Sequence, residues 1–317
     1  MHRRALLVMP ALSPLGAAAQ SAAVRVVVPF PPGGGIDVSG RIFAEALSAQ
    51  LGQPWVVENR SGANGAVGAA AVARAEADGR TILCNSDSHL LARGVMRQVP
   101  YDPVADFTPI ARLAISPLVL VGAPGIAAPD LPALLAEVRA NPDRHAFANT
   151  SLGTSGHLAT EMFRLEAGVP MLIVSYRGTG PALADVVGGQ VGLMMAPLLS
   201  ALPLIQAGRL RAYCVTGPGR AAVAPDIPNA AEAGMPALAP IAPWFAFWGP
   251  RGLAAAEVAR IHAAVQRAAA TPEVVRKLAD LGGAPVQGES PAQFAALITE
   301  AGERGLSILR RAGVQPE

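Results

Sequence analysis

Hydroxyl and amide side chains are concentrated in residues 149–157, which read Asn-Thr-Ser-Leu-Gly-Thr-Ser-Gly-His. The segment lies between a predicted strand at 146–148 and a predicted helix at 155–167. Because a helix N-terminus leaves backbone N–H groups unpaired, it attracts anions. An ordinary helix cap needs only one Ser or Thr and remains the alternative. The excess of neutral donors predicts a carboxylate site whose contacts are Ser151, Thr154 and Ser155.

A second loop, residues 29–37, has the sequence Pro-Phe-Pro-Pro-Gly-Gly-Gly-Ile-Asp. It follows a predicted strand at 24–28 and opens a predicted helix at 36–51. Ligands of open α/β sheets lie beyond the carboxyl ends of strands, and glycine lets the backbone approach them closely. The glycine spacing differs from that of dinucleotide and phosphate loops. A tight structural turn is the alternative to a ligand site formed by Phe30, Pro31, Gly33, Gly34 and Asp37.

Two further polar loops follow predicted strands, so we expect them at the same carboxyl-end edge of the sheets as the first two loops. Residues 85–89 contribute Ser86 and Ser88, and residues 175–185 contribute Tyr176 and Arg177. For Arg177, ligand contact and simple closure of the surface are equally good interpretations. Asp87 and His89 are also polar, but residues of these types more often cap the next helix.

The sequence offers little for catalysis. The histidines lack the spacing of metal ligands, no G-x-S-x-G or S-x-x-K motif occurs, and Lys277 is the single lysine. We therefore expect no cofactor, no metal and no enzymatic activity. A hydrolase that uses Asp37 or Asp87 remains the alternative from the enzyme class.

Short β-type runs alternate with helical runs along the chain, which predicts an α/β fold with parallel strands. Two apolar stretches without helical period, residues 113–121 and 242–248, are candidates for a two-strand hinge. We therefore expect a first lobe at 20–121 plus 241–317 and a second lobe at 122–240. Three C-terminal helices would complete the first lobe.

Composition narrows the choice of partner. The net charge is only +2 and aromatic residues make up 4% of the 317 residues, so no nucleic acid is expected as a partner. A hydrophobic content of 51% suits a folded core.

The N-terminus has the pattern of a secretory signal peptide at residues 1–19. Two arginines precede a short apolar run, and an A-x-A sequence places cleavage near Ala19. No cysteine follows the cleavage region, so we expect a periplasmic protein without a lipid anchor. The two cysteines, Cys84 and Cys214, lie in separate apolar runs and favour two buried thiols over a disulfide.

Several ordered motifs resemble the Bug/TctC family of extracytoplasmic receptors of tripartite tricarboxylate transporters. The resemblance covers essentially the whole mature chain. It is carried by residues 29–37, 57–65, 77–79, 101–103, 151–158, 176–182, 188–189, 208–212, 232–234 and 248–249.

The resemblance implies a two-lobed periplasmic-binding (type II, flytrap) fold with two mixed sheets flanked by helices. It implies a small carboxylate ligand, membrane permease subunits as partners, and we expect a monomer. In the family the Pro-Gly loop holds one end of the ligand and the Ser/Thr loop a carboxylate. Most members have an aspartate where this chain reads Met194-Met195-Ala196-Pro197, which disfavours an amine-bearing ligand. A sensory module that presents its ligand to a signalling receptor is the third hypothesis.

Overall fold

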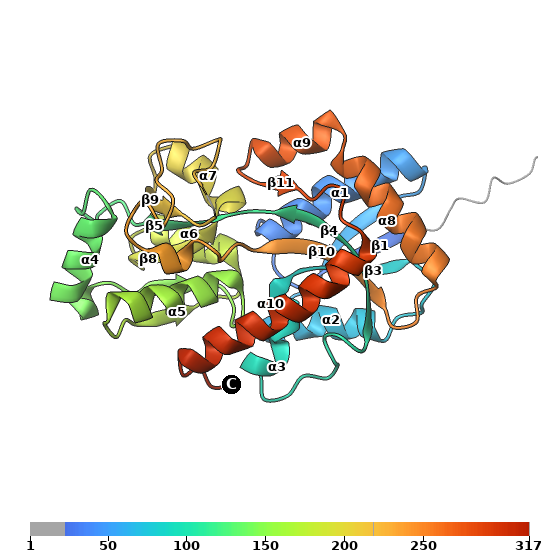
Figure 1. Cartoon of the computed structure of the whole chain (residues 1–317), viewed down its shortest axis with the longest axis horizontal. Helices are drawn as coiled ribbons and strands as arrows, with labels where there is room; N and C mark the ends of the chain where they lie inside the picture. The colour runs from blue at the N-terminus through green and yellow to red at the C-terminus, as the bar shows by residue number, and fades with distance from the viewer. Residues whose placement is uncertain (1–22, 218, 317) are drawn as a thin grey trace, which may run out of the picture.

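The computed structural model describes residues 23–217 and 219–316. The expected signal peptide at 1–19 and its cleavage site lie outside these residues. The described chain forms two sheets, each flanked by helices (Figure 1). We call each sheet with its helices a lobe, and the prediction of an α/β fold with two mixed sheets is confirmed.

The first lobe contains a six-stranded sheet in which parallel and antiparallel pairs are mixed. Its order is β11 (Ala284–Pro285), β4 (Phe107–Ile115), β10 (Trp244–Pro250), β3 (Thr81–Ser86), β1 (Val24–Val28), β2 (Trp55–Asn59). β1 lies between β3 and the edge strand β2 and is parallel to both, and β10 is antiparallel to β3 and β4. Because β1 has helices on both sides, its Val-rich sequence is almost wholly buried.

The second lobe contains a five-stranded sheet, also mixed. Its order is β7 (Ile173–Ser175), β6 (Phe147–Asn149), β8 (Leu193–Pro197), β5 (Leu118–Gly122), β9 (Arg211–Val215). β6 is parallel to β7 and β8, whereas β5 is antiparallel to β8 and β9. The carboxyl ends of β6, β7 and β8 therefore share one edge of the sheet, as the loops of a ligand site require.

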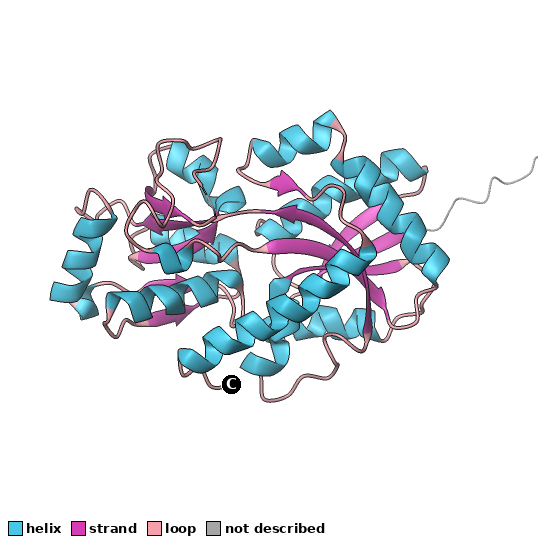
Figure 2. Ribbon diagram, in the orientation of Figure 1, coloured by secondary structure: helices cyan, strands magenta, loops and turns pink. Residues whose placement is uncertain are grey.

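Helices cover both sheets (Figure 2). The first lobe has α1 (Gly35–Leu51), η1 (Ala63–Gly65), α2 (Ala66–Ala73), η2 (Asp87–Leu91), α3 (Ala92–Val95), α8 (Ala255–Ala269), α9 (Pro272–Ala279) and α10 (Pro291–Arg311). The second has α4 (Leu131–Ala140), η3 (Pro142–Arg144), α5 (Ser155–Ala167), α6 (Thr179–Val187), α7 (Leu198–Gln206) and η4 (Pro236–Leu238).

Two extended crossings join the lobes. The outward crossing runs from β4 to β5 through Ser116 and Pro117, and the return crossing enters β10 at Trp244. The Ser116 amide donates to the Pro243 carbonyl at 3.1 Å, so the crossings lie side by side. β5 belongs to the second sheet, so the chain changes sheet before Leu118 and not after residue 121. Pro117 lies at the change, because it lacks an N–H and ends the hydrogen-bond ladder of β4.

The helix α10 extends from the first lobe toward the second and packs against β4, η2 and α5 (Figure 1). Cys84 lies in β3 and Cys214 in β9, both as buried free thiols, so the prediction of two separate thiols is confirmed. Burial raises the pKa of both. Across the described chain no helix combines the length and apolar character needed to cross a membrane.

Candidate functional site

A cavity of about 60 Å³ lies between the lobes, lined by residues from both sheets and from the crossings. This is several times the space that one water needs, so a small ligand fits. The first lobe contributes the loop after β1, the second contributes the loops after β6 and β7, and Leu118, Pro243 and Phe245 of the crossings close one side.

Three helices begin at this cavity. Gly34 and Gly35 start α1, Ser155 and Gly156 start α5, and Gly178 and Thr179 precede or start α6; all six residues line the cavity. Each helix start brings unpaired N–H groups and about half a positive charge to its end. The lining contains no Lys or Arg among the described residues. The positive potential therefore comes from backbone and neutral donors.

Asp37 is the charged residue of the lining, but its carboxylate is already engaged. It accepts from the Gly33 amide at 3.0 Å, from Asn59 at 2.9 Å and from the Arg41 guanidinium at 3.0 Å. Burial raises the pKa of Asp37, but these hydrogen bonds and the Arg41 charge outweigh it, so the pKa lies below its ordinary value. Asp37 fixes the glycine loop and has little capacity left for a ligand.

The Ser/Thr-rich loop is both a helix cap and part of the cavity wall. Thr154 is the N-cap of α5: its hydroxyl accepts from the His157 amide at 3.2 Å and donates to the Ser151 carbonyl at 2.9 Å. The Ser151 hydroxyl donates to the Thr150 carbonyl. The ordinary-cap interpretation is therefore correct for Thr154, which nevertheless lines the cavity.

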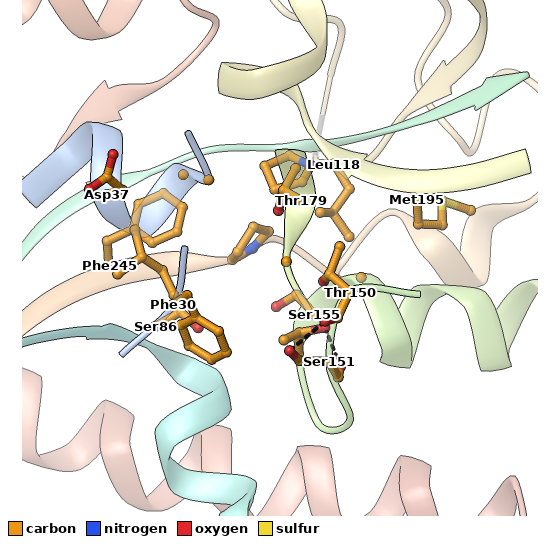
Figure 3. A pocket seen from close by; sticks show the side chains of 18 of the residues that line it. Phe30, Asp37, Ser86, Leu118, Thr150, Ser151, Ser155, Thr179, Met195 and Phe245 are labelled. Carbon is orange, nitrogen blue, oxygen red and sulfur yellow. Dashed lines mark hydrogen bonds between the residues drawn. The ribbon is translucent and has the colours of Figure 1, made fainter. Parts of the chain in front are cut away.

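The remaining wall is apolar. Figure 3 shows Phe30 and Phe245 on one side of the cavity, across from Leu118, Thr179 and Ser151. The α1 start lies so close to Phe245 that a Cβ atom on Gly35 would be 2.6 Å from its ring. A glycine is required there because the backbone itself forms the wall.

Eight of the twelve predicted ligand contacts line the cavity: Phe30, Pro31, Gly34, Asp37, Ser86, Ser151, Thr154 and Ser155. Gly33 lies beside the cavity. Its N–H donates to the Asp37 carboxylate, and its carbonyl accepts from the Ser200 hydroxyl at 3.2 Å. The Ser88 hydroxyl instead bonds that of Ser86 at 2.8 Å.

Tyr176 and Arg177 lie outside this cavity. Both line a neighbouring and wider cavity of about 590 Å³ that shares Phe30, Pro31 and Ser151 with the first. The Tyr176 hydroxyl donates to Asp185 at 2.8 Å, which fixes it against α6. The structure therefore places these two side chains at the outer rim of the cleft.

His89 lies away from both cavities and is fully enclosed by aromatic rings. Its ring centroid is 4.5 Å from that of Phe107 and 5.2 Å from that of Trp248. Burial lowers the pKa of His89 to about 3, so the ring is neutral. A ligand role for His89 is not supported by this position.

Sequence reasoning missed Thr179, Met195, Leu118 and Phe245, which all line the cavity. Thr179 carried a usable signal, since it follows Gly178 at a helix start as Ser155 follows Thr154. Leu118 and Phe245 belong to the predicted crossings, but an apolar strand residue gives no sign of facing a ligand. Within the described ranges, no cluster of three or more His, Cys, Asp or Glu side chains could hold a metal.

The profile of the tripartite tricarboxylate transporter receptor family, TctC, matches residues 40–314. The chain belongs to this family. It is 36% identical to protein BugT of Bordetella pertussis over 294 residues, covering 92% of this chain and 90% of BugT.

Two solved structures with ligands are also similar. Rpa4515 of R. palustris with adipate has a TM-score of 0.90 and 33% identity, over 93% of this chain and 99% of that one. MatC of Rhodopseudomonas palustris with bound malate has a TM-score of 0.85 and 32% identity, over 91% and 99%.

Membership of the TctC family makes the chain a solute-binding receptor and not an enzyme, and the family consists of periplasmic binding proteins. The prediction of this family and of a receptor function is confirmed. The alternative of a hydrolase is wrong, because the family is one of solute-binding receptors. Asp37, one of the two candidate catalytic carboxylates, is also held by Arg41 and Asn59. The strand β8 ends in Met195, Ala196 and Pro197, of which Met195 and Pro197 line the cavity.

Proposed function

We propose that this TctC receptor binds a small carboxylate in the cavity between its lobes and delivers it to the membrane permease of a tripartite transporter. The observation that supports this is the convergence of three helix N-termini on a cavity without Lys or Arg among its described lining residues. Such a site attracts an anion through many weak donors.

The size and the walls favour a compact acid with an apolar middle. Phe30, Leu118, Met195 and Phe245 can pack against methylene or methyl groups, while the helix starts take the carboxylate. Relatives with adipate and with malate provide two small dicarboxylates, of which adipate has a middle made of methylene groups alone. An amine on the ligand would find no free carboxylate among the described lining residues, because that of Asp37 is already paired.

In this proposal the permease recognises the conformation in which the two lobes are closed. The Asn64 amide donates to the Leu152 carbonyl at 2.9 Å and Ser200 donates to Gly33, so the lobes touch on both sides of the cavity. A ligand that contacts both lobes stabilises this arrangement over an open one. Because sensing uses the same closure, a transport assay in a deletion strain distinguishes delivery to a permease from presentation to a signalling receptor.

The location and state of the protein are part of the proposal. We infer export to the periplasm with cleavage near Ala19, and action as a monomer. Mass spectrometry of the mature N-terminus and light scattering of the purified chain test these two points.

A thermal-shift screen of residues 20–317 tests the ligand class. The panel contains mono-, di- and tricarboxylates, including malate and adipate, with acidic and neutral amino acids as comparison. A ligand present at about 100 times its Kd adds about 2.7 kcal/mol of stability, a shift of several degrees. Folded, ligand-free protein that responds to no carboxylate would contradict the proposal.

The site is tested by Thr179→Val, which removes a hydroxyl from the start of α6 and keeps the shape of the side chain. We expect the Kd of the carboxylate found above to rise about ten- to hundredfold, since a lost charge-assisted hydrogen bond costs about 1.5–3 kcal/mol. Thr179→Ser should retain affinity. The matched control is Thr299→Val on the exposed face of α10, which should leave the Kd unchanged.

A further inference from the structure

One hydrogen bond joins the ligand cavity to a carboxylate behind it. Ser155, the first residue of α5, lines the cavity, and its hydroxyl donates to Asp87 Oδ2 at the start of η2. Asp87 belongs to the first lobe and Ser155 to the second, so the bond also crosses between lobes. The Ser88 amide donates to Asp87 Oδ1 at 3.1 Å, which fixes the carboxylate from its own turn.

The Ser155 hydroxyl has one proton, and Asp87 decides where it goes. While Asp87 is charged, its carboxylate accepts the hydrogen bond from the Ser155 hydroxyl. The Ser155 oxygen then offers the ligand cavity only its lone pairs. A ligand carboxylate would then meet an acceptor with a negative charge behind it. Once Asp87 is protonated, its own O–H can donate to Ser155, and the Ser155 proton becomes free to bind the ligand.

Asp87 can exchange protons without passing through the ligand cavity. It lines a second cavity of about 320 Å³, between α5, α10 and the segment 237–242, which shares Ser155 with the ligand cavity. The charged groups of this rear cavity, among its described lining residues, are Asp87 itself and Arg304 and Arg311 of α10. Both arginines are exposed, so they weakly oppose protonation of Asp87.

The environment of Asp87 brings its protonation close to neutral pH. Burial raises the pKa of Asp87 to about 6, although hydrogen bonds from Ser155, Ser86 and the Ser88 amide and the charge of Arg304 act in the opposite direction. A carboxylate ligand beside Ser155 raises this pKa further, because like charges disfavour ionisation.

We propose that Asp87 is a positioning residue that sets whether Ser155 accepts or donates a hydrogen bond in the ligand cavity, so that carboxylate binding is coupled to uptake of one proton. This inference rests on the proposed function, since it takes the ligand to be a carboxylate. By linkage, affinity rises as pH falls through the pKa of Asp87. Each unit by which the ligand raises that pKa makes binding tenfold tighter at low pH than at high pH.

Titration calorimetry with malate and adipate tests the coupling between pH 5.5 and 8.5, in buffers with different heats of ionisation. If the ligand raises the pKa of Asp87 by about one unit from its value of about 6, about half a proton is taken up per bound ligand near pH 6.5, and the Kd is about tenfold higher at pH 8.5 than at 5.5. In Asp87→Asn the amide donates to Ser155 permanently, so proton uptake disappears and the Kd at pH 8.5 approaches the low-pH value of the wild type.

Two further variants separate this role from a structural one. Ser155→Ala should bind weakly at every pH, because the hydroxyl that Asp87 controls is gone. Asp143→Asn, at an exposed site in η3, should keep the wild-type pH profile. Cooperative unfolding of each variant shows that it is folded. A folded Asp87→Asn protein that keeps the wild-type pH profile and proton uptake would overturn the proposal.

A measurement without ligand covers the case in which neither acid binds. Carbon-13 NMR of aspartate carboxyl groups should show one titration with a midpoint near pH 6 that is missing in Asp87→Asn. Ser155→Ala should move the midpoint upward, because the charged carboxylate loses a donor. A midpoint that stays unmoved by Ser155→Ala overturns the Asp87–Ser155 coupling, whereas failure of malate and adipate alone counts against the proposed function.

Discussion

At the scale of single residues, two glycines of the same loop are required for different reasons. Gly33 has a φ of 89°, which L side chains adopt at a cost, but a Cβ there would meet nothing within 4 Å. Gly35 lies at the α1 start, where a Cβ would be 2.6 Å from the Phe245 ring. Replacement by alanine therefore separates backbone strain from damage to the cavity wall.

We expect Gly33→Ala to lower the free energy of unfolding by about 1–2 kcal/mol and to leave the ligand Kd unchanged. Gly35→Ala should displace Phe245 and raise the Kd about tenfold, which corresponds to a loss of about 1.4 kcal/mol of binding free energy. Urea unfolding and calorimetry measure the two effects. Equal effects of both substitutions on the Kd would contradict the assignment of Phe245 to the wall.

The buried His89 makes stability depend on pH. Its pKa is about 3 in the folded chain, below the ordinary value of 6.5, because its ring is enclosed by Phe107 and Trp248. The stability from the neutral ring is complete above pH 6.5 and is lost as pH falls toward 3, since the unfolded chain binds the proton first.

His89→Phe should therefore remove part of the acid sensitivity. The unfolding free energy of the wild type should fall between pH 7.5 and 5.5 by on the order of 1 kcal/mol more than that of the variant. Urea unfolding at both pH values measures the difference. Parallel losses in the two proteins would show that His89 is not a buried neutral group.

The residues that sequence reasoning found in the cavity share a property that is visible without a structure. Phe30, Ser151 and Ser155 lie between the end of a strand and the first turn of the next helix, in segments with more glycine or hydroxyl than a turn needs. Tyr176 and Arg177 met the same condition, yet Tyr176 turns to Asp185 because that acceptor lies within reach on α6. Side-chain direction depends on such tertiary partners, which spacing along the chain does not encode.

At the scale of elements, α10 is held against η2 by a glycine that approaches Leu91. A Cβ on Gly305 would lie 2.6 Å from a methyl of Leu91, which is buried and has no room to move. On Gly302, one turn earlier in the same helix, a Cβ would make an ordinary 4.0 Å contact with Leu90. Only Gly305 is required by packing.

Alanine at these two positions should have opposite effects. Gly302→Ala should raise the free energy of unfolding by up to about 1 kcal/mol, because glycine is a poor helix former. Gly305→Ala should lower it by about 1–3 kcal/mol, because the added methyl overpacks the contact with Leu91. Thermal unfolding measures both, and stabilisation by Gly305→Ala would show that α10 is not tightly packed there.

Element prediction worked where periodicity was strong and failed where it was absent. The three expected C-terminal helices are present as α8, α9 and α10, because their apolar spacing is regular. Pro272 marks the start of α9 and Ser290 that of α10. The run 113–121 contains two strands of different sheets, β4 and β5. Continuous apolar sequence is buried in either sheet, so only the pairing partners decide where one ends.

At the scale of the whole molecule, the site exists only because the two lobes meet. Gly34 of the first lobe approaches Thr179 of the second, and Ser155 reaches Asp87 across the same cleft. Separation of the lobes would break each of these contacts and open the cavity to solvent. Ligand affinity and the degree of closure are therefore linked through one equilibrium.

A disulfide across the cleft can report this equilibrium. A Cβ on Gly34 would lie 3.8 Å from Thr179 Cβ, the usual separation in a disulfide. We expect Gly34→Cys with Thr179→Cys to cross-link under mild oxidation, detected by gel mobility without reductant. The native thiols should stay reduced, since Cys84 and Cys214 are buried.

Ligand should increase the rate of cross-linking if it stabilises the closed arrangement and leaves the two thiols free to meet. The control pair is Gly33→Cys with Thr179→Cys, because a Cβ on Gly33 has no atom within 4 Å and so lies farther from Thr179 than the mean Cβ separation of a disulfide, about 3.8 Å. Cross-linking of the control as fast as the test pair would mean that the loop, and not lobe closure, brings the sulfurs together. Cross-linking of the Gly34 pair alone would establish that the closed form is populated in solution.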